Sequence, residues 1–282
     1  MAQSLVWLAS YPKSGNTWLR LVLASYLHPD IEEGPNQLVA GTIGDGSKAI
    51  FDHVGLDLGG KLPESSNEWW ERRDEMLRLL ANRQTDPQLL KSHFLNARFD
   101  GLELIPRDLT FAAIHVVRHP FDVCVSFAKH LGQSLEQTAK AMCSDECTLT
   151  LPEEMPTPLT SWSRHSTSWF AHSSNRRLTI RYEDMKLRPT MTFGNVLSVL
   201  GVRVDLARLE SALQKTNFSK LKAHEQEQAF VEASKRNPHA FFNHGEIGRG
   251  ATELPSHLQE LLVKHCAPAM EQFGYTADGM VI

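Results

Sequence analysis

Short apolar runs bounded by turn residues recur along the chain and predict buried strands. The clearest are residues 5–10, residues 178–182 and residues 111–117, in which His115 is the single interruption. Runs of this length and apolarity are typical of strands covered on both faces. A shorter run at residues 89–93 follows Pro87 and ends in polar residues. The pattern predicts a strand at each of these four runs.

Helical spacing of apolar positions follows several of these runs. Trp18, Leu21 and Val22 give residues 17–27 a helical period, and Pro29 stops that helix. A capping box at Ser65 and Glu68 opens another helix. The remaining predicted helices cover residues 121–131, 189–200, 206–213 and 255–273. Residues 28–61 are expected to be long loops with short elements, residues 183–188 a turn, and residues 214–254 a polar connection.

Strands that alternate with helices predict an α/β fold whose parallel sheet is covered by helices on both faces. Ligands of such sheets bind beyond the carboxyl ends of the strands. Lys13, His93, Arg118 and Tyr182 each follow or close a predicted strand. We therefore expect these four polar side chains to converge at one edge of the sheet.

Composition narrows the class of protein. The 282 residues allow one large domain or two small ones, and 41% hydrophobic with 22% charged residues is typical of a folded globular chain. Subtracting 33 acidic from 29 basic residues gives a net charge of −4, which argues against wrapping of nucleic acid. The chain shows no signal-peptide pattern and no apolar run long enough to span a membrane, so a cytoplasmic protein is expected.

The cysteines predict free thiols. There are four of them, at positions 124, 143, 147 and 266, which is too few for a disulfide framework in a chain of this size. Cys143 and Cys147 lack a second pair of ligands at zinc-site spacing. No metal site is expected.

The turn after the first strand has phosphate-binding chemistry. Residues 11–18, Tyr-Pro-Lys-Ser-Gly-Asn-Thr-Trp, join a strand to a helix, and backbone N–H groups at a helix N-terminus bind anions. Gly15 permits close approach of the backbone, while Lys13 and Ser14 add a charge and a hydroxyl donor. The loop is not a classical P-loop, because its lysine precedes the glycine. Taken alone, it is as well explained by an ordinary turn capped by Asn16 or Thr17.

Four segments, in one order, resemble motifs of a known family. Residues 11–20 resemble the 5′-phosphosulfate loop of sulfotransferases that use 3′-phosphoadenosine 5′-phosphosulfate (PAPS). Residues 118–126, Arg-His-Pro-Phe-Asp-Val-Cys-Val-Ser, are similar to the family's 3′-phosphate motif. Residues 91–93, Lys-Ser-His, and residues 181–185, Arg-Tyr-Glu-Asp-Met, resemble two further family segments. The resemblance covers most of the chain and implies a P-loop-like three-layer fold, with a central parallel β-sheet flanked by helices.

The resemblance implies a donor site. Lys13 would stabilise the negative charge that grows on the bridging oxygen of the phosphosulfate. The guanidinium of Arg118, with Ser126, would bind the 3′-phosphate. Aromatic residues would surround the adenine, although core packing is the alternative for Trp18. The residues implied to bind the donor are Lys13, Ser14, Gly15, Asn16, Thr17, Trp18, Arg118, Ser126, Tyr182, Thr216, Phe218, His244 and Gly245.

The resemblance also implies a catalytic set of His93, Lys13 and Lys91. An imidazole titrates near neutrality and suits a general base that takes the proton of an acceptor hydroxyl. His93 is one of 13 histidines, and its place in the Lys-Ser-His segment is what singles it out. Lys91 would neutralise the oxygens of the transferred sulfuryl group.

One segment departs from the family pattern. The family often carries R-K-G-x-x-G-x-W near the C-terminus, closing over the 3′-phosphate. Here Asn243 and His244 stand for the two basic residues, and Gly250 stands for the tryptophan. Arg249, or a basic pair at residues 235–236, is a candidate to compensate for the lost charge.

The resemblance predicts a PAPS-dependent sulfotransferase that needs no metal and releases adenosine 3′,5′-bisphosphate (PAP). A nucleotide-dependent kinase on a related fold is the first alternative, but the chain lacks its Gly-Lys-[Ser/Thr] loop. A non-catalytic PAP-binding protein is the second. The altered Asn243 and His244 favour it, and the intact Lys13 and His93 disfavour it.

The acceptor is expected to be a small molecule with a hydroxyl, with neither nucleic acid nor a membrane as partner. Loops at about 28–67 and 132–169 are predicted to form its site. Aromatic residues in and beside these loops suit a phenol, a glycoside or another natural product, with core packing as the alternative; they are Phe51, Trp69, Trp70, Trp162 and Trp169. Homo-oligomerisation stays open. Because the motifs belong to one site, residues 1–282 are expected to form a single domain.

Overall fold

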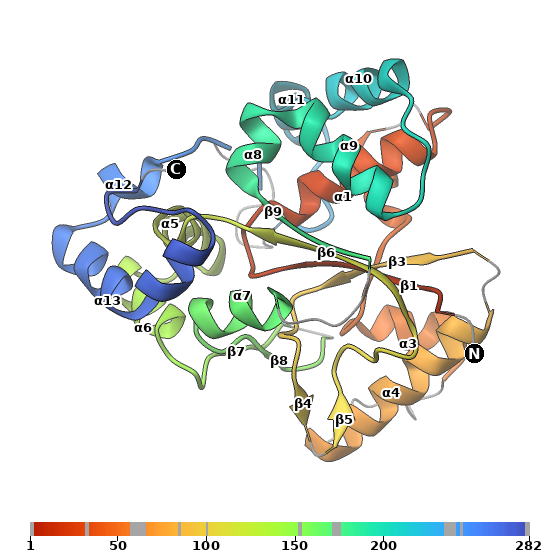
Figure 1. Ribbon diagram of the computed structural model, residues 1–282, viewed down its shortest axis with the longest axis horizontal. Coiled ribbons are helices and arrows are strands. Elements are labelled where there is room, and N and C mark those ends of the chain that lie inside the picture. The colour runs from red at the N-terminus through yellow and green to blue at the C-terminus, as the bar shows by residue number, and fades with distance from the viewer. Residues whose placement is uncertain are drawn as a thin grey trace.

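A five-stranded parallel sheet forms the centre of the molecule (Figure 1). The computed structural model describes residues 3–31, 34–56, 66–83, 86–99, 101–151, 154–170, 176–233, 241–242 and 245–279. The strands lie in the order β2-β3-β1-β6-β9, and every neighbouring pair is parallel. Their bounds are β1 Leu5–Ser10, β2 Ile43–Gly44, β3 Gln88–Ser92, β6 Thr110–Val117 and β9 Arg177–Arg181. The predicted α/β class with a parallel sheet is confirmed.

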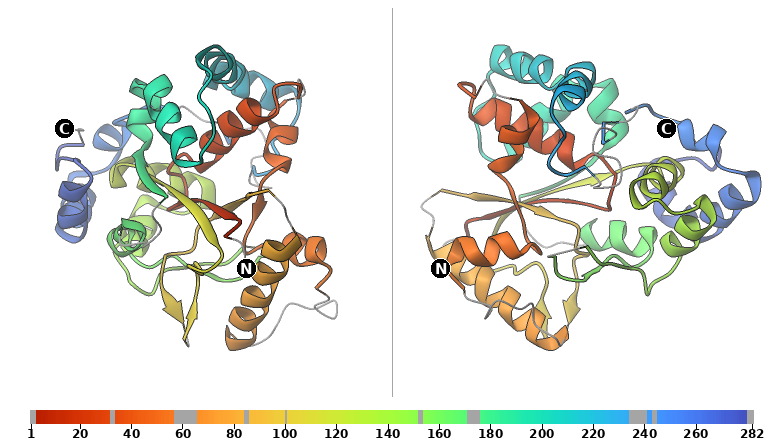
Figure 2. Two further views of the ribbon diagram at one scale, coloured as in Figure 1. Left: turned by 45° about the vertical axis from the view of Figure 1, so that its right-hand side comes forward. Right: turned by 180° about the vertical axis from the view of Figure 1, so that it is seen from behind.

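Helices cover both faces of the sheet, as Figures 1 and 2 show. The upper face in Figure 1 carries α1 (Asn16–Leu27), α8 (Tyr182–Leu187), α9 (Pro189–Val199), α10 (Leu206–Lys215) and α11 (Phe218–Glu227). The lower face carries α3 (Lys48–Val54), α4 (Ser66–Arg83) and α7 (Trp162–Phe170). Helix α2 (Pro35–Ala40) packs against α1. Two hairpins complete these layers, β4 (Arg98–Phe99) with β5 (Leu102–Glu103), and β7 (Thr148–Leu149) with β8 (Thr157–Pro158).

A further group of helices lies beyond the carboxyl ends of the strands, at the left of Figure 1. It consists of α5 (Pro120–Leu131), α6 (Leu135–Met142), α12 (Arg249–Glu253) and α13 (Ser256–Gln272), which pack on one another. Because α5 starts directly after β6, this group forms one wall of the space beyond the strand ends. No helix of the described residues is long and apolar enough to cross a membrane.

Alternate side chains of β1 point into the two main hydrophobic cores, one on each face of the sheet. Leu5, Trp7 and Ala9 pack with the α3 and α4 side chains of the lower layer. Val6 and Leu8 pack with α1 and α9 in the upper layer. Successive side chains of a strand point to opposite faces, so a continuous apolar run serves both layers. This explains why the first strand is apolar at every position but its last.

Some sequence predictions need correction. The segment after Tyr182 is not a turn, because Tyr182 opens helix α8 instead of ending the strand. The polar connection after α10 contains helices α11 and α12. Helix α11 escaped detection because few of its side chains face the core: Leu221 and Glu225 are its buried residues. Ser65 of the predicted capping box lies outside the described residues.

The aromatic residues near the predicted acceptor loops belong to the core. Phe51, Trp69, Trp70, Trp162 and Trp169 are all buried. The alternative of core packing is therefore confirmed for these five. All four cysteines are free, and Cys124 and Cys266 are buried.

Candidate functional site

A cavity of about 860 Å³ opens at the carboxyl ends of β1, β3 and β6, a size typical of small-ligand sites. Its walls bring together residues far apart in the sequence. Of the predicted site residues, those lining it are Lys13, Gly15, Asn16, Thr17, Trp18, Lys91, His93, Arg118, Ser126, Tyr182, Phe218 and Gly245. Ser14 and Thr216 are fully buried and do not line it. His244 lies outside the described residues.

The loop between β1 and α1 has an unusual backbone. Lys13 and Gly15 both have positive φ, of 66° and 105°. A Cβ atom at Gly15 would lie 2.5 Å from Cδ2 of Tyr182, so only glycine fits there. Helix α1 then begins at Asn16, and the first N–H groups of a helix have no partner inside it. The start of α1 lines the cavity, so these N–H groups could serve as a cradle for an anion there.

Asn16 fixes this cradle to the sheet. Its Nδ2 donates to the Leu8 carbonyl oxygen at 2.7 Å, and its Oδ1 accepts from Nε of Arg20 at 3.0 Å. Both polar atoms of the Asn16 side chain are therefore occupied. The buried Oγ of Ser14 has no hydrogen-bond partner among the described residues.

His93 presents one ring nitrogen to the cavity. Its Nδ1 lies 2.8 Å from the carbonyl oxygen of Ser10, which can only accept, so Nδ1 carries the proton. Nε2 is then the unprotonated nitrogen. Burial, with the charge of Lys91, lowers the pKa of His93 to about 3, so the ring is neutral at physiological pH and does not titrate near neutrality as the sequence led us to expect. His165 Nε2 donates to the His93 carbonyl oxygen at 3.0 Å and steadies its backbone.

Two lysines flank His93. The ammonium of Lys13 lies 4.1 Å from the ring centroid of Phe241, and burial lowers the pKa of Lys13 to about 8. Nζ of Lys91 donates to Oε1 of Glu232 at 3.2 Å. The structure thus joins Lys13, Lys91 and His93, the predicted catalytic set, at one end of the cavity.

Glu232 at this end of the cavity was not predicted. Its Oε2 accepts from Nη2 of Arg20 at 2.6 Å and from Oγ1 of Thr17 at 3.0 Å. Arg20 is only 1% exposed. Glu232 follows Arg20 by 212 residues, and no local pattern in the sequence signals the pairing.

Arg118 lies in a second cationic region of the cavity, the Arg118 end, which adjoins the first because its Nη1 donates to the Lys13 carbonyl oxygen at 3.4 Å. Its Nη2 donates to the Glu246 carbonyl oxygen at 2.8 Å and to Oδ2 of Asp122 at 3.3 Å, and its guanidinium lies 4.4 Å from the Tyr182 ring centroid. Asp122 also accepts from the backbone N–H groups of Gly248 and Gly250, at 3.0 and 2.7 Å. Ser126 lines the same end, two turns into α5.

Aromatic rings line the cavity beside these cations. Trp18 both lines the cavity and packs against Phe193, with ring centroids 5.7 Å apart, so it serves the site and the core together. Its Nε1 donates to the Thr216 carbonyl oxygen at 3.1 Å, while the Thr216 hydroxyl donates to Ala212. Thr216 therefore supports Trp18 from behind and does not itself line the cavity.

Lys186 adds a cation that sequence reasoning missed. Its ammonium lies 5.5 Å from the ring centroids of both Trp18 and Phe218, and it lines the cavity. Lys186 follows Tyr182 by one turn of α8, so the two share a helix face. Recognising α8 in the sequence would have indicated this lysine.

The segment that departs from the family pattern closes the Arg118 end by its backbone. A Cβ atom at Gly250 would lie 2.3 Å from the carbonyl carbon of Phe121, so α12 packs directly on the start of α5. Arg249 lines the cavity, but its guanidinium pairs with Glu253 and, at 3.7 Å, with Glu246. Asn243 and the basic pair at residues 235–236 lie outside the described residues.

A third part of the cavity is largely apolar. Phe127, Leu131, Leu149 and Leu151 line it, with Glu154 as its carboxylate. Leu149, Leu151 and Glu154 belong to the second predicted acceptor loop, and Gly44 and Ser47 belong to the first. Among the described residues, no group of His, Cys, Asp and Glu has an arrangement that would hold a metal ion.

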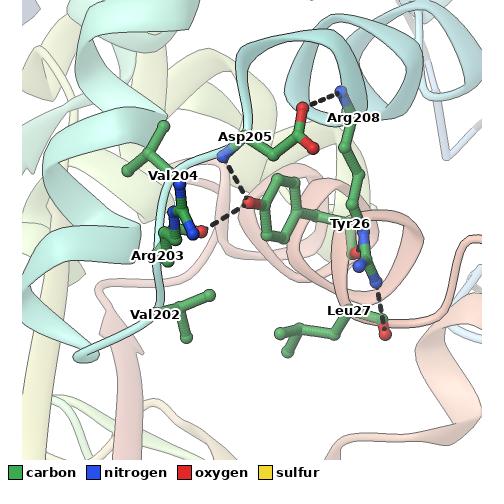
Figure 3. Close-up of a pocket in the computed structure, with 7 residues that line it drawn as sticks. All are labelled: Tyr26, Leu27, Val202, Arg203, Val204, Asp205 and Arg208. Carbon is green, nitrogen blue, oxygen red and sulfur yellow. Dashed lines mark hydrogen bonds between the residues drawn. The ribbon is translucent and has the colours of Figure 1, made fainter.

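A second cavity lies at the far end of α1, away from the strand ends (Figure 3). Its polar atoms are already paired. The Tyr26 hydroxyl donates to the Arg203 carbonyl oxygen at 2.8 Å and accepts from the Asp205 N–H at 2.9 Å, while Arg208 donates to the Leu27 carbonyl oxygen. These bonds tie α1 to the connection between α9 and α10. They occupy the polar groups that a ligand would otherwise bind.

Comparison with known proteins agrees with this geometry. The family model described as "Sulfotransferase domain" matches residues 3–274. Sulfotransferase 4A1 of Mus musculus and that of Rattus norvegicus are each 26% identical over 214 residues, which cover 74% of this chain and 64% of the relative. The chain thus spans less than two thirds of the length of these relatives.

Solved structures show the same fold. Mouse sulfotransferase SULT7A1, complexed with PAP, is 18% identical with a TM-score of 0.60, over 94% of this chain and 85% of that one. Retinol dehydratase, in a complex with retinol and PAP, is 16% identical with a TM-score of 0.64, over 96% of this chain and 82% of that one.

Proposed function

This chain belongs to the sulfotransferase-domain family, and from that premise we propose that it transfers a sulfuryl group from PAPS to the hydroxyl of a small molecule. One observation carries the proposal. Lys13, Lys91 and His93 line one cationic end of the cavity, and Arg118 and Ser126 line the adjoining cationic end. A nucleotide with phosphate groups on its 5′ and 3′ carbons needs two such cationic ends, and the similar structures were solved with PAP. On this view the chain folds as one domain around one site.

The residues present fit the donor. The N–H groups at the start of α1 would hold the 5′-phosphate, with Lys13 beside the bridging oxygen. Arg118 and Ser126 would hold the 3′-phosphate, and Lys186 would supply charge that the altered segment lacks. Trp18, Phe218 and Tyr182 would enclose the adenine, with Gly245 held by the Tyr182 hydroxyl at 2.9 Å.

The transfer is a single displacement at sulfur. The acceptor oxygen forms the new bond to sulfur, the bond from sulfur to the bridging oxygen breaks, and that oxygen leaves on the 5′-phosphate of PAP. The acceptor proton passes to Nε2 of His93, which the Ser10 carbonyl keeps unprotonated. Lys13 stabilises the charge on the leaving oxygen, and Lys91 the sulfuryl oxygens.

The acceptor would enter along the apolar wall. Phe127, Leu131 and Leu149 favour a molecule with an aromatic or aliphatic body next to its hydroxyl. This class includes phenols and natural products. Both predicted acceptor loops contribute residues to the cavity lining, which supports this route.

Substitution of His93 tests the assignment of the base. With PAPS and a phenol as acceptor, His93→Ala should lower kcat by about 10²–10⁴-fold, the usual contribution of a general base. His257→Ala removes an exposed histidine and is the matched control. If His93→Ala keeps most of its turnover while Lys13→Met loses it, His93 is not the base. Tight binding of PAP without turnover on any acceptor would instead indicate the non-catalytic alternative.

A further inference from the structure

The carboxylate of Glu232 lies among the cations at the Lys13 end of the cavity. It accepts from Arg20 at 2.6 Å, from Thr17 at 3.0 Å and from Lys91 at 3.2 Å. Thr17 and Lys91 are also residues that the proposed function assigns to the phosphosulfate. Glu232 therefore uses the hydrogen-bond donors that an incoming anion would need.

Arg20 is built to face an anion. Its Nε donates to Oδ1 of Asn16 at 3.0 Å and its Nη1 to Oγ1 of Thr42 at 3.2 Å, which fixes the guanidinium from behind. Nη2 alone points to Glu232 and Thr17. A guanidinium this deeply buried needs a negative partner, because an unpaired buried charge is strongly destabilising. If Glu232 left, another anion would have to replace it.

Glu232 carries its negative charge in the free protein. Burial alone would raise the pKa of its carboxyl group, but Lys91 and Arg20 hold that pKa well below its usual range. A carboxylate and a phosphosulfate carry charges of the same sign, so they do not share one set of three donors.

We infer that Glu232 stands in for the donor in the free protein, and that the phosphosulfate group displaces it and takes Thr17, Arg20 and Lys91 as partners. The inference rests on the proposed function and extends it. It makes Arg20 a donor-binding residue and makes Glu232 the residue that sets donor affinity.

The surroundings of Glu232 allow this exchange. Phe230 is buried in a small core with Leu21 and Leu38, which anchors the segment. Asn36 holds it from outside, accepting from the Val231 N–H at 2.9 Å and donating to the Ala229 carbonyl oxygen at 3.1 Å. The backbone is thus held independently of the carboxylate, and rotation of the Glu232 side chain is enough to vacate the cation cluster.

Calorimetry with two nucleotides tests the inference. PAP carries a 5′-phosphate and adenosine 3′-monophosphate lacks it, so only PAP competes with Glu232. Glu232→Gln keeps the shape and removes the charge, and it should tighten PAP binding by about tenfold or more, since apparent affinity scales with the fraction of vacant sites. The affinity for adenosine 3′-monophosphate should stay within about twofold. Glu246→Gln, at the Arg118 end, is the control for charge removal in the same cavity.

Three results would overturn the inference: an unchanged PAP affinity, an equal gain for both nucleotides, or the same gain from Glu246→Gln. Failure of PAP to bind either protein would contradict the proposed function instead. In that case inorganic pyrophosphate serves as the test ligand, because it can bind the cations around Glu232 without an adenosine site. It should raise the Tm of Glu232→Gln more than that of the wild type, and an equal rise counts against the inference. If Glu232→Gln does not fold, Glu232→Asp, which withdraws the carboxylate by one methylene, should show a smaller gain in PAP affinity, and no gain counts against it.

Discussion

The two ends of the cavity hold their cations in different ways. At the Lys13 end, Arg20 and Lys91 are neutralised by the side chain of Glu232. At the Arg118 end, the guanidinium is held by the carbonyl oxygens of Glu246 and Lys13 and by Asp122, whose carboxylate is itself tied to backbone N–H groups. The first end is held by one carboxylate side chain, and the second by backbone carbonyl oxygens and a carboxylate that backbone N–H groups fix in place. The contrast suggests that the Arg118 end supplies constant affinity and the Lys13 end controls access.

Removing the Arg118 guanidinium should have the largest effect on PAP binding. Arg118→Gln should weaken PAP binding by about 100-fold, because charge-assisted hydrogen bonds to a phosphate are worth about 1.5–3 kcal/mol each. Adenosine 5′-monophosphate lacks the 3′-phosphate and serves as the matched ligand. Calorimetry with both nucleotides measures the difference. An equal loss for the two would show that Arg118 supports the fold of the site and does not read the 3′-phosphate.

Disturbing the backbone of the same end should have the next largest effect. Gly250→Ala places a Cβ atom 2.3 Å from a backbone carbon of Phe121, and that contact cannot relax by side-chain rotation. We expect a loss of about 2 kcal/mol in the free energy of unfolding, typical of overpacking, measured by urea denaturation. Gly194→Ala is the control, because Gly194 lies inside α9 with no atom within 4 Å of its added Cβ. An equal stability of both variants would contradict the tight packing of α12 on α5.

The pH dependence of PAP binding tests the Lys13 end and should be the smallest of the three effects. Burial lowers the pKa of Lys13 to about 8, so Lys13 is charged below that pH and loses its charge above it. PAP affinity should therefore fall, by at most about tenfold per pH unit, as the pH rises through this value. Lys13→Arg keeps its charge and should remove the dependence. A flat profile in the wild type would place Lys13 away from the bound phosphate.

The sequence predicted four of the five strands of the sheet, and most of the site residues that it predicted line the cavity, for a physical reason. Parallel strands place their carboxyl ends at one edge, so Lys13, His93 and Arg118 were expected to converge from their positions alone. Lys186 was missed because α8 is short and follows β9 without a break. Gly250 was noted only as a departure, since nothing local reveals that its Cα packs against α5.

Glu232 marks the limit of that reasoning. Its carboxylate belongs to the site because of partners on α1 and β3, and the residues around it show no motif. Side chains that complete a charge cluster are set by tertiary contacts, so they become visible only in the folded chain. The same holds for Thr216, which supports Trp18 through a carbonyl oxygen that any residue would offer.

Tyr182 has a consequence for chimeric proteins. Its ring leaves no room for a side chain at Gly15, its face carries the guanidinium of Arg118, and its hydroxyl holds the carbonyl oxygen of Gly245. The positions of three loops that are distant in sequence thus all depend on contacts with this one ring. Any exchange of these loops with those of a relative must therefore transplant the tyrosine and its three neighbours as a set.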